Sequence, residues 1–395
     1  MATTYSDVIG TSDLPDALRV IYSNELQMTA QANLLYEQFV DSKLEFASKR
    51  GQQVYWTIYR QLPPAIGTLT ENTDVDGGQL QDFQVNFTVD EYGYSIGTTE
   101  KLNFESYHGP IENITRTLLG PQMALTSDIL ARNAYIGTGA TYRTYAGTAT
   151  ARGDVASSGY LDETIVRKAA HNLSIRRVPL MGNGYVCLCH PSNIYDLRNS
   201  TYWKDANLYA SSVNIFNGEV GMLHGVRFIE CHNARLPNAG AVTATTTLND
   251  AACTAGELTF TVTDSTGFAA GQEITIVPSG HVPDGTHAAE EHVIISSIDG
   301  NVITLRQKMQ LDHANSSVVR EARDIFPLVF LGSEKAVGKG VILPPEVRVA
   351  LPTDKLRRMS FVGWYGILGF GVIRDWAMDV WEVAASQSSA YPYGW

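Results

Sequence analysis

Apolar side chains alternate with glycine or polar residues over the twenty-three positions from Phe361 to Val383. This period of two predicts a β-strand. At about 3.3 Å per residue the segment would extend about 75 Å. Because this exceeds the usual length of a strand, we expect a bend or turn near Arg374 and Asp375. A strand this long, packed against a long helix, favours an elongated, plate-like molecule.

Four glycines lie within the first part of this segment, GWYGILGFGV, and raise the alternative of a phosphate-binding loop. The dinucleotide fingerprint GxGxxG needs a third glycine where this chain has Arg374. Three of the four glycines share the strand face opposite the aromatic side chains, where glycine permits close approach of another backbone. We therefore expect a helix or a neighbouring strand to pack there. The packing candidates are Gly363, Trp364, Gly366, Gly369, Phe370 and Gly371.

An extended hairpin is predicted over residues 51–101. Two alternating segments, residues 53–62 and a second from Phe83, are separated by about twenty residues without periodicity. After Glu91 the apolar phase slips, which predicts a bulge or bend. An isolated hairpin is only marginally stable, so we expect a neighbouring molecule to cover it. The candidate contact residues are Ile66, Leu69, Glu71, Asp74 and Leu80.

Helical periodicity appears in two segments of the first half. Apolar residues from Leu26 to Phe46 predict a helix that ends before Gly51, and a stripe from Ile111 to Ile136 predicts a second, longer one. Gly120 and Pro121 predict either a kink in the longer helix or a break into two.

Residues 160–240 indicate a mixed α/β unit. Asp162 is placed to cap one helix, and Pro191 lies in the first turn of another. The segment YVCLCH between them predicts a short buried strand, and residues 226–230 predict a second.

The composition changes near residue 241 to short segments rich in Thr, Val and Ile. The Asp299-Gly300 pair between two such segments is a strong hairpin signal. Residues 241–322 therefore indicate a small, all-β inserted domain.

Composition excludes several classes of protein. Apolar residues make up 44% of the chain and charged residues 18%, which favours packed cores over disorder. No apolar run approaches the roughly 18 residues of a membrane span, and the N-terminus does not resemble a secretory signal, so we expect a protein kept inside the cell. The formal net charge of −12 argues against a tight nucleic-acid binder.

Candidate chemistry is sparse. The four cysteines form no disulfide framework, and the CLCH segment at residues 187–190 lacks the usual CxxC spacing of a zinc site. No GxSxG or HExxH motif is present. His281, His287 and His292 lie in or beside one irregular loop, where we expect them to be solvated. We therefore expect no catalytic, metal-binding or cofactor-binding residues, while an enzyme with an unrecognised site stays as an alternative.

The order of these parts resembles the major capsid proteins of tailed bacteriophages, with the Hong Kong 97 type fold. The segment KLRRMSFVGWYGILGFGVIRDWAMDVWEVA is similar to the closing strands of that family, and GEVGMLHGVRFIE is similar to its axial-domain turn and strand. The resemblance covers about 300 residues and excludes 241–322, as in the group with an inserted surface domain. It implies an α+β fold.

The resemblance divides the chain into the parts of that fold. They are an N-terminal arm and helix (1–50), an extended E-loop hairpin (51–101), the spine helix and first part of the peripheral domain (102–150), the axial domain (151–240), the inserted all-β domain (241–322), the axial-domain return (323–345) and the closing strands of the peripheral domain (346–395).

The resemblance also implies partners. The chain would self-assemble into pentamers and hexamers of an icosahedral shell in the virion, assembled in the host bacterial cytoplasm without a membrane. Residues 63–82 contain no lysine, so a lysine–asparagine crosslink is not expected there, and the short N-terminal arm favours a separate scaffold protein. A portal, a decoration protein and weakly contacted double-stranded DNA are the other implied partners. An encapsulin-like compartment shell shares the fold and stays as an alternative.

Overall fold

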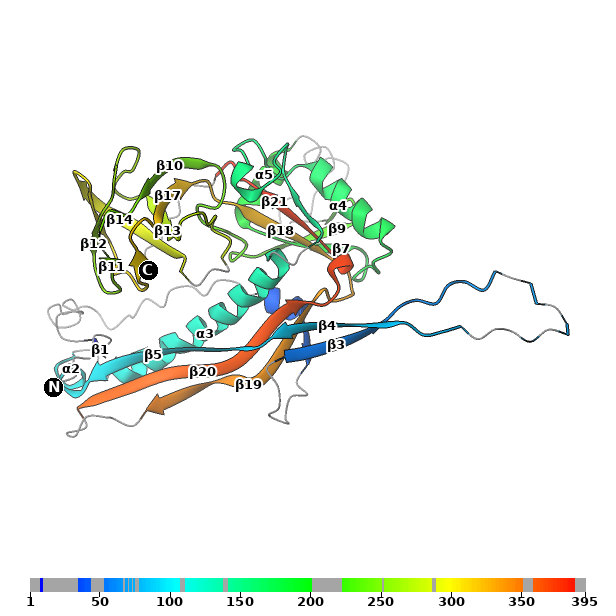
Figure 1. Ribbon diagram of the computed structural model, residues 1–395, viewed down its shortest axis with the longest axis horizontal. Coiled ribbons are helices and arrows are strands. Elements are labelled where there is room, and N and C mark those ends of the chain that lie inside the picture. Colours follow the sequence, from blue (N-terminus) through cyan, green and yellow to red (C-terminus); the bar gives the residue numbers. More distant parts are fainter. Residues whose placement is uncertain are drawn as a thin grey trace, which may run out of the picture.

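A computed structural model gives the fold of the chain (Figure 1). It describes residues 8–9, 35–43, 53–66, 68–69, 71–72, 74, 78–106, 111–137, 141–200, 222–250, 252–285, 289–350 and 358–387. Two sheets with helices, a separate β unit and a projecting hairpin make up this part of the chain.

The first sheet is built around strand β20 (Met359–Val372), which lies between β5 (Asp90–Thr99) and β19 (Val337–Ala350). Both neighbours pair with β20 in antiparallel register. Short strands complete the edges, with β1 (Val8–Ile9) beside β5 and β2 (Asp41–Lys43) beside β19. The expected long strand therefore exists and is the centre of its sheet.

The expected bend is also confirmed. After β20 the chain makes one 3-10 turn, η3 (Asp375–Ala377), and continues as β21 (Met378–Val383) in the second sheet. The alternating segment therefore joins two sheets.

Helix α3 (Ile111–Ile136) lies along one face of the first sheet (Figure 1). It is a single helix that continues through Pro121, so the expected break into two helices is wrong. Leu119 packs with Val362 and Trp364 of β20, and the Trp364 indole donates a hydrogen bond to Gln122 Oε1 at 2.5 Å. A short helix, α2 (Glu100–Glu105), precedes it and is capped by the Thr99 hydroxyl.

The second sheet runs in the order β6 (Arg143–Tyr145), β21, β18 (Phe326–Leu331), β7 (Tyr185–Cys189), β9 (Val226–Glu230) and β8 (Met222–Leu223). One face packs on α4 (Glu163–Ile175) and α5 (Pro191–Asn199), and the other packs on the end of α3. Asp162 caps α4 by accepting from the Ile165 amide at 2.9 Å, as the sequence predicts. A 3-10 turn, η2 (Arg152–Asp154), lies at its edge.

The N-terminal helix expected from Leu26 to Phe46 is wrong where the chain is described. Residues 36–39 form only a 3-10 turn, η1 (Tyr36–Phe39), and residues 41–43 form strand β2. Leu26 and Phe46 lie outside the described residues. Tyr36 is fully buried beside Tyr135 of α3, and Phe39 also packs on that core. Tertiary packing therefore fixes these aromatic residues without a regular helix.

The predicted strands of the hairpin are β3 (Gln53–Tyr59) and β4 (Asp82–Thr88), which pair from Gln53 with Thr88 to Tyr59 with Asp82. The phase slip predicted near Glu91 corresponds to a change of partner. At Val89 the chain leaves the hairpin, and from Asp90 it pairs with β20 instead.

The segment from 242 to 322 forms a β unit with a core of its own. Its sheet runs in the order β10 (Val242–Thr247), β17 (Val318–Ala322), β13 (Glu273–Val277), β14 (Glu291–Asp299), β15 (Val302–Leu305) and β12 (Thr259–Thr261). A bridge between Leu248 and Val262 joins the two outer strands and closes a barrel. A two-stranded ladder, β11 (Ala252–Cys253) with β16 (His313–Ala314), lies beside it. Closure protects the sheet edges that an open sheet would expose. The Asp299-Gly300 turn between β14 and β15 is confirmed.

Gly369 and Gly371 lie in the extended backbone of β20 under the base of the hairpin. A Cβ added at Gly369 would lie 2.3 Å from the Thr88 carbonyl oxygen, and one at Gly371 would lie 2.5 Å from the Phe87 ring. The approaching segment is therefore a strand. The other expectation, that the long helix packs on this glycine face, is wrong, because α3 packs against Trp364 on the opposite face.

Gly369→Ala is expected to lower the unfolding free energy by about 1–3 kcal/mol, because the backbone of residue 88 must move to accept the methyl group. Chemical unfolding of the unassembled protein measures the change. Gly153→Ala is the matched control, since its added Cβ meets nothing within 4 Å. Equal stability of the two variants would contradict the packing account.

Acid is expected to destabilise the second sheet through His190, the N-cap of α5. Its Nδ1 accepts from the Ser192 amide at 3.2 Å, and its ring packs on Phe326. Burial, helped by the charge of Arg235, lowers the pKa of His190 to about 3 from an ordinary 6.5. The folded state therefore disfavours the proton. The contribution of neutral His190 to the unfolding free energy is fully present above pH 6.5. It is lost as the pH falls toward 3, by at most about 1.4 kcal/mol per pH unit.

Unfolding measured between pH 7 and 4 tests this. His190→Asn keeps a capping oxygen that does not titrate. The slope of the unfolding free energy against pH should therefore decrease by the contribution of one proton. His171→Asn, at an exposed histidine of α4, should leave the dependence unchanged. A wild-type slope in His190→Asn would refute the assignment.

Candidate assembly interface

The base of the hairpin is packed into the body of the molecule. Val54 and Trp56 of β3 are buried, and Trp56 stacks on Phe87 with the ring centroids 5.3 Å apart. Both side chains lie against glycines of β19, because a Cβ at Gly340 would lie 2.5 Å from Val54 and one at Gly338 would lie 3.0 Å from Trp56. The hairpin is therefore anchored at its root.

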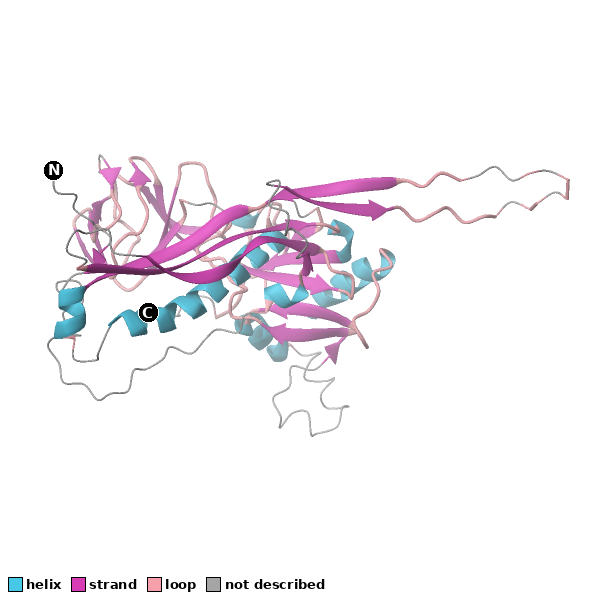
Figure 2. Ribbon diagram, turned by 90° about the horizontal axis from the view of Figure 1, so that it is seen from below, coloured by secondary structure: helices cyan, strands magenta, loops and turns pink. Residues whose placement is uncertain are grey.

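Beyond that root the hairpin projects away from the rest of the chain (Figure 2). Its large apolar side chains are exposed to solvent: Tyr59, Leu62, Ile66, Leu69 and Leu80. Ile66 is 89% exposed and Leu69 is 78% exposed. A row of apolar side chains on a projecting arm marks a contact surface rather than a core.

The five contact candidates share one extended segment of the hairpin. Ile66, Leu69, Glu71, Asp74 and Leu80 all lie in the segment between β3 and β4, and all are exposed. This segment therefore combines exposed apolar and acidic groups.

Sequence reasoning missed two further residues of this surface. Tyr59 is 67% exposed, and Leu62, which the period of two places on the buried face, is 62% exposed. Alternation identifies the face of a strand, but it does not show where along the hairpin the body of the molecule ends.

The packing candidates of β20 lie together, on two faces. Trp364 and Gly366 are buried, whereas Phe370 is half-buried. A Cβ at Gly363 would lie 2.6 Å from the Tyr94 carbonyl oxygen, and one at Gly366 would lie 3.0 Å from Pro345. Together with Gly369 and Gly371 they hold β20 against the strands on either side and the hairpin base.

A buried ion pair joins two segments of the body. Arg152, in an Arg-Gly-Asp sequence, is buried and donates from Nε and Nη2 to the two Glu382 oxygens at 2.7 Å each. These bonds counter the effect of burial and keep the pKa of Arg152 above its ordinary value. The tripeptide is therefore a structural element that joins η2 to β21.

The four cysteines are buried and form no disulfide, which accords with core positions. Burial raises the pKa of the Cys231 thiol to about 12, so the thiolate needed for nucleophilic attack is disfavoured. Among the described residues, no helix is long and apolar enough to cross a membrane.

The barrel is fixed to the body through Arg235. Its Nε donates to Asp324 Oδ2 and its Nη2 donates to Glu273 Oε2 of β13, each at 2.7 Å. Burial raises the pKa of Asp324, although Arg235 opposes this shift. Arg132 of α3 donates to the Arg235 carbonyl at 2.9 Å. The Arg235 side chain thus links the barrel to the segment before β18, and its main-chain carbonyl is held by the long helix.

Comparisons with known proteins find similarity to phage capsid proteins. The family model described as "Phage capsid protein" matches residues 132–265. Comparison with curated protein sequences finds no match.

Among solved structures, the capsid of Ralstonia phage GP4 is similar at 15% identity, with a TM-score of 0.56 over 98% of this chain and 99% of that one. The capsid of cyanophage P-SCSP1u is similar at 13% identity, with a TM-score of 0.58 over 98% and 100%. The capsid of the Helicobacter pylori bacteriophage KHP30 is similar at 13% identity, with a TM-score of 0.53 over 97% and 100%. The chain therefore has an α+β capsid fold.

Glu273→Gln is expected to loosen the barrel from the body, because Arg235 loses a charged partner beside Asp324. The unfolding free energy should fall by about 1–3 kcal/mol, and amide exchange should accelerate in β10, β13 and β17. Glu346→Gln, which removes an exposed ion pair with Arg348, should change the stability by less than about 1 kcal/mol. Unchanged exchange in Glu273→Gln would show that Arg235 does not fix the barrel.

Proposed function

We propose, on the premise that this chain is a phage capsid protein, that it is the major capsid protein and that its copies form the phage head shell. It is a structural protein rather than an enzyme. The observation that carries the mechanism is the projecting hairpin, whose apolar tip the chain leaves exposed. Burying that tip on a second copy makes the free energy of assembly favourable through the hydrophobic effect.

The parts of the chain take the roles of the Hong Kong 97 type fold in this proposal. Residues 51–101 are the E-loop and α3 is the spine helix. The axial domain is built from residues 151–240 and 323–345, and β6 and β21, from the ranges 102–150 and 346–395 expected in the peripheral domain, join it in the second sheet. The barrel of residues 241–322 is an inserted surface domain. Support comes from the element order and from the close packing of α3 on β20.

Assembly joins the copies into pentamers and hexamers of an icosahedral shell in the virion, formed in the host bacterial cytoplasm. A separate scaffold protein, a portal and a decoration protein are the proposed partners. Double-stranded DNA is contacted weakly, since the chain carries a formal net charge of −12. The solved structures named above are phage capsids, which favours a phage head over an encapsulin-like compartment.

Truncating the hairpin tip is expected to prevent shell formation and leave the subunit folded. Ile66→Ala with Leu69→Ala removes apolar surface that is exposed in the subunit, so the unfolding free energy of the subunit should stay within about 0.5 kcal/mol of the wild type. Charge reversal, Glu71→Lys or Asp74→Lys, should impair assembly in the same way. Sedimentation and electron microscopy measure the fraction of subunits in shells.

Ile175→Ala is the matched control, because Ile175 is an exposed isoleucine of α4, away from the hairpin. It should assemble like the wild type. Normal yield and stability of shells in the hairpin variants would remove the hairpin from the mechanism.

A further inference from the structure

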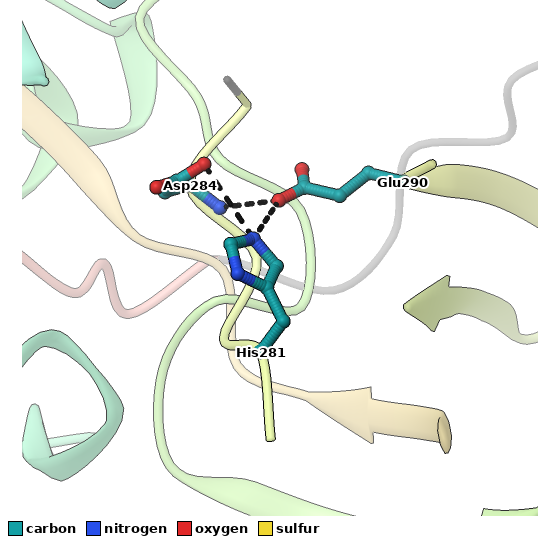
Figure 3. Close-up of side chains that lie close together, drawn as sticks. All are labelled: His281, Asp284 and Glu290. Carbon is teal, nitrogen blue, oxygen red and sulfur yellow. Dashed lines mark hydrogen bonds and ion pairs between the residues drawn. The ribbon is translucent and has the colours of Figure 1, made fainter. Parts of the chain in front are cut away.

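The loop between β13 and β14 brings together one histidine and two carboxylates, His281, Asp284 and Glu290 (Figure 3). One ligand atom from each lies within 4.8 Å of the other two. His281 Nε2 is 2.8 Å from Glu290 Oε1 and 3.7 Å from Asp284 Oδ1. Among the described residues, these three are the one group of histidine, cysteine, aspartate or glutamate side chains whose spacing suits a metal ion.

Glu290 is held in a fixed orientation. The Asp284 amide donates to its Oε1 and the Gly285 amide donates to its Oε2, each at 2.9 Å. The Glu290 side chain is nearly buried, at 4% exposed, whereas His281 is 25% exposed. The cluster therefore has one pre-oriented ligand, and its histidine is partly exposed to solvent.

We propose that His281, Asp284 and Glu290 bind a divalent transition-metal ion of the zinc class. An imidazole nitrogen with two carboxylate oxygens is a donor set that suits zinc, and three protein ligands leave a fourth position for water. An all-oxygen cage, which calcium and magnesium prefer, is absent from this group.

The separations are compatible with this assignment after a small movement. Zinc bonds of about 2.1 Å in tetrahedral geometry place neighbouring ligand atoms about 3.4 Å apart. The His281–Asp284 separation of 3.7 Å is already close to that value. The His281–Glu290 contact must open from 2.8 Å. The ring proton then moves from Nε2 to Nδ1, so that the neutral imidazole coordinates the ion through Nε2.

The ion would lie where the barrel meets the long helix. Within the same loop, the Gly285 carbonyl accepts from Asn133 Nδ2 of α3, and the Pro283 carbonyl accepts from Arg152 at 3.4 Å. A metal ion that closes the loop would fix both carbonyls. This proposal does not depend on the assembly of a shell.

Zinc titration of the chelator-treated full chain tests the site, with stoichiometry measured by equilibrium dialysis and calorimetry. One zinc ion per chain is expected. His281→Gln and Asp284→Asn should each weaken binding at least about tenfold. His171→Gln, at an exposed histidine of α4, should bind like the wild type.

Metal-free unfolding of each variant checks that the fold is retained. If folded His281→Gln and Asp284→Asn bind zinc as tightly as the wild type, the ion sits elsewhere and the proposal is overturned. It is also overturned if the wild type binds no zinc, or if calcium competes equally. In each of these cases the loop is held by its hydrogen bonds alone.

Discussion

The packing of β20 between two different partners is the constraint on which the rest of the molecule depends. Trp364 and its apolar neighbours bury one face of the strand under α3, and Gly369 and Gly371 leave room on the other face for the base of the hairpin. The same strand continues through η3 into β21 of the second sheet. Helix, hairpin and second sheet are therefore oriented by one segment of chain.

This arrangement explains how a hairpin of marginal stability can project from the rest of the molecule. The strands β3 and β4 form a two-stranded ladder that would be unstable in isolation. Burial of Val54 and Trp56 against Gly340 and Gly338 stabilises its root. The tip then extends from a fixed base, and its apolar side chains are presented to a neighbouring copy in the proposed shell.

The sequence predicts the features that depend on local periodicity. The alternation of β20, its end before Asp375 and the cap at Asp162 follow from the residues alone. Over the described residues 35–43 the N-terminal helix was wrong, because Phe39 packs on the core from a 3-10 turn, beside Tyr36, which is buried against Tyr135. Strand exchange at Val89 appears in the sequence only as a phase slip, which does not identify the new partner.

Contacts between distant segments lie outside such reasoning. The bridge from Leu248 to Val262 that closes the barrel carries no local signal, nor do the bonds that join Arg235 to Glu273 and Asp324. The residues of the His281 loop are close in sequence, but their convergence depends on the backbone amides that hold Glu290.

The central claim is that copies of this chain form a shell through the hairpin. Electron cryomicroscopy of the wild-type protein, expressed with a scaffold partner, tests it most directly. The account predicts closed shells in which the hairpin tip of each subunit lies on an adjacent subunit. Small soluble oligomers alone, or shells with the tip directed into solvent, would contradict it.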